Sequence, residues 1–137
     1  LRLPVDTVAT GRIEPDAASI VVQDGQIPQD MKGADIGPQT IKAYREAILQ
    51  AKTILWNGPM GVFEVKPFDA GTIGIAQAVA EATTAGAVSV IGGGDTAAAV
   101  DAAGLEERMS HISTGGGASL EFLQERHFEA IDLLDEA

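Results

Sequence analysis

Two glycine triplets restrict what this chain can fold into more than any other feature. Residues 92–94 are all glycine and follow the apolar run 88–91, with the small residues of 95–103 directly after them. Residues 115–117 are also all glycine and follow the short segment 111–113. Glycine loses more backbone entropy on folding than any other residue, so three in succession indicate a place where no Cβ fits. Both triplets predict tight connections at which something lies against the backbone.

The rest of the chain alternates short strand patterns with helical patterns. Such alternation is typical of a parallel sheet. We therefore expect an α/β fold with a parallel, Rossmann-like sheet and helices on both of its faces. Its three strand-to-helix units are predicted at 53–84, 87–103 and 110–126. The other expected elements are short strands at 1–9 and 18–22, a loop with a little extended chain at 23–38, a helix at 39–51 and an amphipathic segment at 128–136.

The three unusual loops of the chain, 57–67, 92–96 and 114–117, all follow predicted strands. In parallel sheets, ligands bind in the crevice beyond the carboxyl ends of the strands. Backbone N–H groups at a helix start are unpaired and carry partial positive charge, so they bind anions without a cationic side chain. A single glycine loop is equally consistent with a tight turn alone. Two at one sheet edge favour an anion site.

The type of phosphate ligand is narrowed by the motifs that are missing. The pattern GxxxxGK[ST] is absent, which excludes a Walker-type NTPase. Residues 92–97, GGGDTA, fit the dinucleotide fingerprint GxGxxG/A, but 111–115 offers no acidic residue for a ribose hydroxyl, which weakens a dinucleotide-binding oxidoreductase. A noncatalytic nucleotide- or anion-binding module remains open, because binding and catalysis would use the same loops.

Several side chains near these loops have two available roles. Asp95 suits either the cap of a helix or a ligand of a magnesium ion on a bound nucleotide. Thr96 suits either the same cap or a hydrogen bond to a phosphate group. Glu64 is either an acceptor for ribose hydroxyls or an exposed loop acid. Asn57 is expected to turn the chain out of its strand, and Trp56 is expected in the core of that strand.

The charge distribution adds a constraint on function. The formal net charge is −11, and none of the nine Lys and Arg residues falls in a glycine triplet. A nucleic-acid binder would need a basic footprint, so that class is excluded. Phosphoryl transfer needs positive charge on the equatorial oxygens, so a kinase site here would take it from Mg²⁺ and from residues outside this chain.

The ends and the composition bear on context. There is no cysteine, no apolar run long enough for a membrane span and no signal-peptide pattern, which predicts a cytoplasmic protein that does not bind membranes. The chain lacks an initiator Met, and residues 1–6 resemble the middle of a strand. We therefore expect a fragment of a longer protein.

Five segments, taken in order, resemble the phosphoglycerate kinase family. They are LPVD (3–6), DIGPQT (35–40), AKTILWNGPMGVFE (51–64), GGGDT (92–96) and STGGGASLEF (113–122). The resemblance covers nearly the whole chain and implies its C-terminal third. Residues 1–126 would be the later part of the nucleotide-binding domain, and 127–137 a terminal helical segment that returns to the absent N-terminal lobe.

The resemblance implies a two-lobed, monomeric glycolytic enzyme. It would transfer a phosphoryl group between 1,3-bisphosphoglycerate and ADP, giving 3-phosphoglycerate and ATP, with Mg²⁺ on the nucleotide. The absent N-terminal lobe would bind the phosphoglycerate, so this fragment is expected to be inactive alone. The family pattern departs at Ala34, where a larger apolar residue is usual, and at 124–129, which puts the path of the terminal segment in doubt.

Site roles are carried over from the family motif onto matching positions. The resemblance places Gly33 at the adenine and Glu64 at the ribose hydroxyls, with Asp95 on the magnesium side. Gly94 and Gly117 would offer helix-start N–H groups to the transferring phosphoryl as the catalytic groups. The other expected contacts are Asn57, Pro59 and Val62 along the nucleotide, Gly92, Gly93 and Thr96 at its phosphates, and Thr114, Gly115 and Gly116 in the second phosphate-facing loop.

Overall fold

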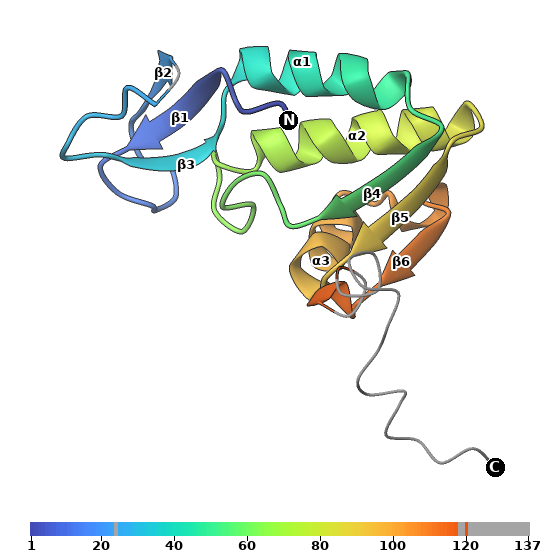
Figure 1. Cartoon of the computed structure of the whole chain (residues 1–137). Helices are drawn as coiled ribbons and strands as arrows, with labels where there is room; N and C mark the ends of the chain where they lie inside the picture. Colours follow the sequence, from blue (N-terminus) through green and yellow to red (C-terminus); the bar gives the residue numbers. More distant parts are fainter. Residues whose placement is uncertain (24, 118–119, 121–137) are drawn as a thin grey trace.

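The computed structural model describes residues 1–23, 25–117 and 120, and all structural statements refer to them. They form two three-stranded sheets with helices packed between and beside them (Figure 1). The elements in chain order are β1 (Asp6–Thr10), β2 (Ser19–Gln23), β3 (Lys32–Ile36), α1 (Pro38–Leu49), β4 (Thr53–Asn57), α2 (Ala70–Thr84), β5 (Val88–Gly92), α3 (Gly94–Ala102), a 3-10 turn (Glu106–Arg108) and β6 (His111–Ser113).

The first sheet is antiparallel, and the sequence did not predict it as a separate sheet. Its strand order is β2-β1-β3, and β1 pairs with both neighbours, with a register shift between Val8 and Ala9 on the β3 side. β3 lies inside the stretch 23–38 that was predicted to be mostly loop. Its sequence KGADI has no continuous apolar run that would predict a strand. Its buried positions arise from pairing with β1 and packing on α2. The expectation of a single parallel sheet is therefore wrong for this part.

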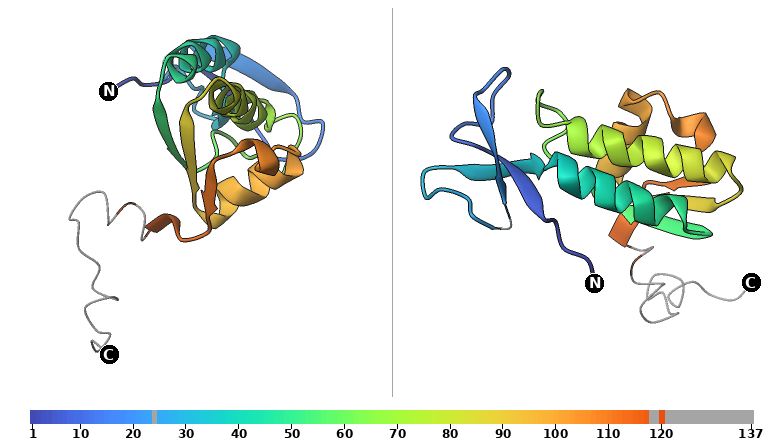
Figure 2. Two further views of the ribbon diagram at one scale, coloured as in Figure 1. Left: turned by 90° about the vertical axis from the view of Figure 1, so that its right-hand side faces the viewer. Right: turned by 90° about the horizontal axis from the view of Figure 1, so that it is seen from above.

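The second sheet is parallel, as predicted, with the strand order β4-β5-β6. The described helices α1, α2 and α3 all lie on one side of it (Figure 2). The expectation of helices on both faces stays a prediction, because the predicted helix at 118–126 lies outside the described residues apart from residue 120. Successive right-handed crossovers that proceed in one direction along a sheet put their helices on the same face, which accounts for α2 and α3. Ile54, Trp56 and Ile91 are buried on that face, whereas Leu55 and Val88 on the other are 40% and 52% exposed.

The core is built mainly from small aliphatic side chains of α2 and the parallel strands. Trp56 is 5% exposed within it, which confirms its predicted place. The boundaries of α1 differ little from the predicted 39–51, and Pro38 occupies its first turn. The predicted terminal elements at 118–126 and 127–137 lie outside the described residues, apart from residue 120.

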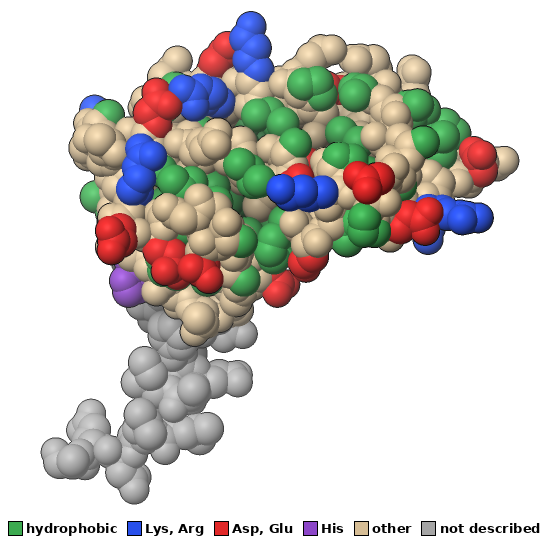
Figure 3. All heavy atoms as spheres, turned by 180° about the vertical axis from the view of Figure 1, so that it is seen from behind, with side chains coloured by type: hydrophobic (Ala, Val, Ile, Leu, Met, Phe, Trp, Pro, Cys, Tyr) green, Lys and Arg blue, Asp and Glu red, His purple; other side chains and the backbone are tan. Residues whose placement is uncertain are grey.

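Lys and Arg side chains are scattered among acidic and apolar ones on the face shown in Figure 3. None of the helices in the described ranges is long and apolar enough to cross a membrane.

Candidate functional site

The two glycine loops lie directly against each other. A Cβ built on Gly116 would lie 2.7 Å from the Cα and 2.8 Å from the nitrogen of Gly93. The Gly93 N–H donates to the carbonyl oxygen of Ser113 over 2.9 Å, at the end of β6. Asn57 lies between the loops: its Nδ2 is 3.4 Å from the Gly116 carbonyl oxygen, and its Oδ1 would be 2.9 Å from a Cβ on Gly93. At Gly93 and Gly116, the space that a Cβ would need is therefore taken by the other loop and by Asn57.

Other glycines of the same triplets have a different surrounding. A Cβ on Gly94 or on Gly117 would meet no described atom within 4 Å, and both residues are exposed. Gly92 is buried, with Asn57 as its nearest neighbour at 3.7 Å from a built Cβ. Packing among the described residues therefore accounts for Gly93 and Gly116 but does not account for Gly94 and Gly117.

Helix α3 begins within the first loop, with Gly93 as its N-cap residue and Gly94 as its first residue. Asp95 is exposed in the first turn and so is not the cap. In the described part of the chain, none of the backbone N–H groups of Gly94, Asp95 and Thr96 donates to a side chain. The Thr96 side chain is fully buried, and its Oγ1 accepts a 2.8 Å hydrogen bond from the Gly58 N–H.

The first turn of α1, in contrast, is bonded to a carboxylate from a distant strand. Asp6 is fully buried, and its oxygens accept hydrogen bonds from the N–H groups of Gln39 (3.0 Å) and Thr40 (2.8 Å) and from the Thr40 hydroxyl (2.6 Å). Gly37 makes this possible, because the carboxyl group occupies the place of its Cβ. Burial raises the pKa of Asp6, but the hydrogen bonds from Thr40 and Gln39 outweigh it and lower the pKa below its ordinary value.

Helix α2 is also bonded to a buried carboxylate, that of Asp35 in β3, which is 4% exposed. Its oxygens accept from the N–H groups of Gly71 (2.6 Å) and Ile36 (2.8 Å), and they occupy the Cβ places of both Gly61 and Gly71. Burial raises the pKa of Asp35 to about 6, with a smaller contribution from the charge of Asp69, while the two N–H groups act against the rise. The sequence reasoning missed this residue as part of a site, although it begins the DIGPQT segment.

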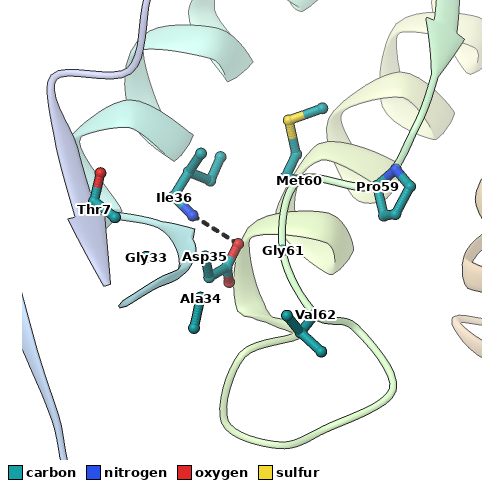
Figure 4. Close-up of a pocket in the computed structure, with 9 residues that line it drawn as sticks. All are labelled: Thr7, Gly33, Ala34, Asp35, Ile36, Pro59, Met60, Gly61 and Val62. Carbon is teal, nitrogen blue, oxygen red and sulfur yellow. Dashed lines mark hydrogen bonds between the residues drawn. The ribbon is translucent and has the colours of Figure 1, made fainter. Parts of the chain in front are cut away.

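A hollow of about 330 Å³ lies between the antiparallel sheet and the loop after β4. Gly33, Pro59 and Val62, three of the predicted contacts, line it together (Figure 4). Its volume falls at the lower end of the range for small-molecule pockets. The other lining residues are Thr7, Ala34, Asp35, Ile36, Met60 and Gly61.

One short segment, 58–62, connects the hollow to the start of α3. At one end the Gly58 N–H is bonded to Thr96, and at the other the Val62 N–H donates to the Ala34 carbonyl oxygen over 2.9 Å. Between them, the hydroxyl of Thr72 accepts from the N–H groups of Met60 and Gly61. Consecutive Cα atoms are about 3.8 Å apart, so the ends of this segment are at most about 15 Å apart. The predicted Glu64 is exposed two residues further on.

The remaining predicted residues bear on whether this site can hold a magnesium ion. Among the residues described, no group of three or more His, Asp or Glu side chains could hold a metal ion. Asp95 offers one exposed carboxylate beside the start of α3, and Mg²⁺ characteristically takes one or two carboxylates together with phosphate oxygens and water. The residues present therefore fit a magnesium ion that arrives with a phosphate ligand. In the second loop, Thr114 is exposed and the Gly115 N–H is 3.3 Å from the Ser113 Oγ.

Comparison with known proteins gives one consistent family. The model of the family described as phosphoglycerate kinase matches residues 1–126. The chain is 54% identical over 134 residues to phosphoglycerate kinase of Chlorobium phaeobacteroides, and 55% identical over 143 residues to that of Rhodopirellula baltica; it covers 34% of each. The solved phosphoglycerate kinase of Coxiella burnetii shares 44% identity at a TM-score of 0.83 over 90% of this chain and 31% of its own. The chain thus spans about a third of the length of these relatives.

Proposed function

This chain belongs to the phosphoglycerate kinase family, and we propose that it supplies the magnesium-nucleotide side of that enzyme's site. The proposed reaction is reversible phosphoryl transfer between 1,3-bisphosphoglycerate and ADP, giving 3-phosphoglycerate and ATP in cytoplasmic glycolysis. In this proposal, the chain is the C-terminal third of the enzyme. The rest of the enzyme would bind the phosphoglycerate. The observation that carries the proposal is the segment 58–62, which joins a pocket-sized hollow to the first turn of a helix.

In this proposal, the base occupies the hollow and the sugar and phosphates follow the segment toward α3. Gly33 and Val62 contact the base, Asn57 and Pro59 lie along the nucleotide, and Glu64 accepts the ribose hydroxyls. A flat, mostly apolar base suits this hollow, because Gly33 adds no side chain to its lining and the buried Ala34 adds only a methyl group.

The phosphate end of the proposed site depends on backbone groups. Exposed Gly94 and Asp95 meet the phosphates, and Gly94 and Gly117 present N–H groups to the phosphoryl in transfer. Preorganised dipoles of this kind stabilise the charge of the transition state without reorganisation. A magnesium ion, when bound beside Asp95, would neutralise phosphate charge. Thr96 is buried, and it contributes by holding Gly58 in place.

Isothermal titration calorimetry tests the proposal. We expect this chain to bind Mg-ADP saturably and to show weaker binding of NADH, because the acidic residue that holds a dinucleotide ribose is missing. Tighter binding of NADH than of Mg-ADP would favour an oxidoreductase domain instead. Phosphoryl transfer by this chain without any added polypeptide would contradict the assignment of the phosphoglycerate side to the rest of the enzyme.

A further inference from the structure

Asp35 connects three backbone segments, two of which line the proposed base hollow. The first is its own strand β3, which forms one wall of the hollow, and the carboxylate bonds to the Ile36 N–H there. The second is the start of α2, through the 2.6 Å hydrogen bond from Gly71. The third is the loop that forms the opposite wall, since Gly61 packs so closely on the carboxylate that a Cβ would collide with it.

The spacing of the two walls is therefore set by a side chain that belongs to neither the phosphate cradle nor the loop itself. In Figure 4 the Asp35 carboxylate lies between β3 and Gly61, at the back of the hollow. Near this point, the backbone of the loop wall also donates to the Thr72 hydroxyl and to the Ala34 carbonyl oxygen. A carboxylate is well suited to the role, because it accepts hydrogen bonds from two N–H groups at once and such charge-assisted bonds are strong.

We infer that Asp35 is a positioning residue for the base-binding half of the nucleotide site, acting through Gly61 and Gly71 rather than by contact with the phosphates. The inference rests on the proposed function, because it takes the hollow as the place of the base. It goes further by dividing the site into a base end that depends on Asp35 and a phosphate end that does not.

The test separates those two ends with two probes, adenosine and inorganic pyrophosphate, each titrated into the chain and into its variants by NMR at pH 7.5. In Asp35→Asn, the amide group can accept only one of the two backbone hydrogen bonds, so the dissociation constant for adenosine should rise about tenfold. The dissociation constant for pyrophosphate should stay within about twofold of the unaltered chain. Equal weakening of both probes, or no change in either, would overturn the inference.

Two further variants keep the test decisive. If Asp35→Asn does not fold, Asp35→Ala is titrated instead, because it removes the carboxylate and with it the connection to Gly61 and Gly71, and the same split is expected. Asp6→Asn is the matched control: it alters an equally buried carboxylate at a helix start that does not line the hollow, so the ratio of the two affinities should not change. Failure of the unaltered chain to bind Mg-ADP or adenosine would instead reject the proposed function itself.

Discussion

The starts of helices α1 and α2 differ from the start of α3 in what meets their backbone N–H groups. Asp6 bonds to the first turn of α1 and Asp35 to that of α2, each from a strand of the antiparallel sheet more than thirty residues away. At α3, the described residues provide no such carboxylate, and the only nearby acid, Asp95, is exposed on the helix itself. The same chemistry therefore serves two purposes in our proposal: an internal anion fixes the fold at α1 and α2, and α3 is proposed to present its donors to an anion from outside.

Glycine marks both situations, but for different reasons. Gly37, Gly61 and Gly71 make room for the two internal carboxylates, and Gly93 and Gly116 make room for each other's backbone. Gly94 and Gly117 have no described neighbour within reach of a Cβ. The difference teaches that a glycine triplet combines packing positions with open positions, and that only the open ones are available to a ligand.

The largest effect should come from removing an internal carboxylate. Asp6→Ala leaves the Gln39 and Thr40 N–H groups and the Thr40 hydroxyl without their buried acceptor, so the free energy of unfolding should fall by about 3 kcal/mol. Urea unfolding followed by the fluorescence of Trp56, the single tryptophan, measures this. A loss below about 1 kcal/mol would mean that the internal anion contributes little to the fold.

A packing glycine should be the next most sensitive position. Gly116→Ala forces a methyl group to within 2.7 Å of the Gly93 Cα, which should destabilise the chain by about 2 kcal/mol through overpacking of the two loops. The same urea titration gives the value. An unchanged midpoint would show that the loops separate at no cost, contrary to their close contact.

An open glycine should behave in the opposite way. Gly94→Ala meets no described atom and occupies the first position of α3, where alanine is the better helix former, so the free energy of unfolding should stay equal or rise slightly. The added methyl group lies over the proposed phosphate cradle, so Mg-ADP should bind about tenfold more weakly, which corresponds to a loss of about 1.4 kcal/mol in binding free energy. Calorimetry measures the affinity of both variants, Gly94→Ala and Gly116→Ala, for Mg-ADP, with a correction for the folded fraction. If both variants lose stability and neither loses affinity, the contrast between open and packing glycines is wrong.

The two internal carboxylates should also differ in their response to pH. Asp35 has a folded-state pKa of about 6, above its ordinary 3.8, so the folded chain holds an extra proton between those values and stability falls as pH rises through them. Between pH 5 and 7 the loss should be about 1 kcal/mol. Asp6 has a lowered pKa, so its contribution is lost only as pH falls below 3.8. Urea midpoints at a series of pH values test this, and Asp35→Asn should remove the decline above pH 5.

The sequence predicted the parallel half of the fold well, because its signals are local. The predicted units 53–84 and 87–103 begin within one residue of β4 and β5, and Trp56 was placed correctly in the core. The antiparallel sheet could not be predicted in the same way. β3 has no apolar run of its own, and its burial arises only from β1 and α2.

The sequence singled out residues that the structure brings together, but it did not reveal the difference between packing glycines and open glycines. The motifs pointed to Gly33, Pro59 and Val62, and the structure brings them together around one hollow. Nothing local distinguishes Gly93 from Gly94, because the distinction depends on a loop more than twenty residues later. Asp35 was missed for the same reason, since its partner Gly71 is 36 residues away.

One measurement tests the contrast between the helix starts most directly. Amide ¹H–¹⁵N NMR spectra of the chain, recorded during titration with Mg-ADP, report on each N–H group separately. The resonances of Gly94 and Asp95 at the start of α3 should shift saturably, with one dissociation constant, while those of Gln39 and Thr40 at the start of α1 stay in place. Saturable binding that leaves Gly94 and Asp95 unmoved, or that moves Gln39 and Thr40 equally, would contradict the assignment of α3 as the helix that accepts an anion from outside.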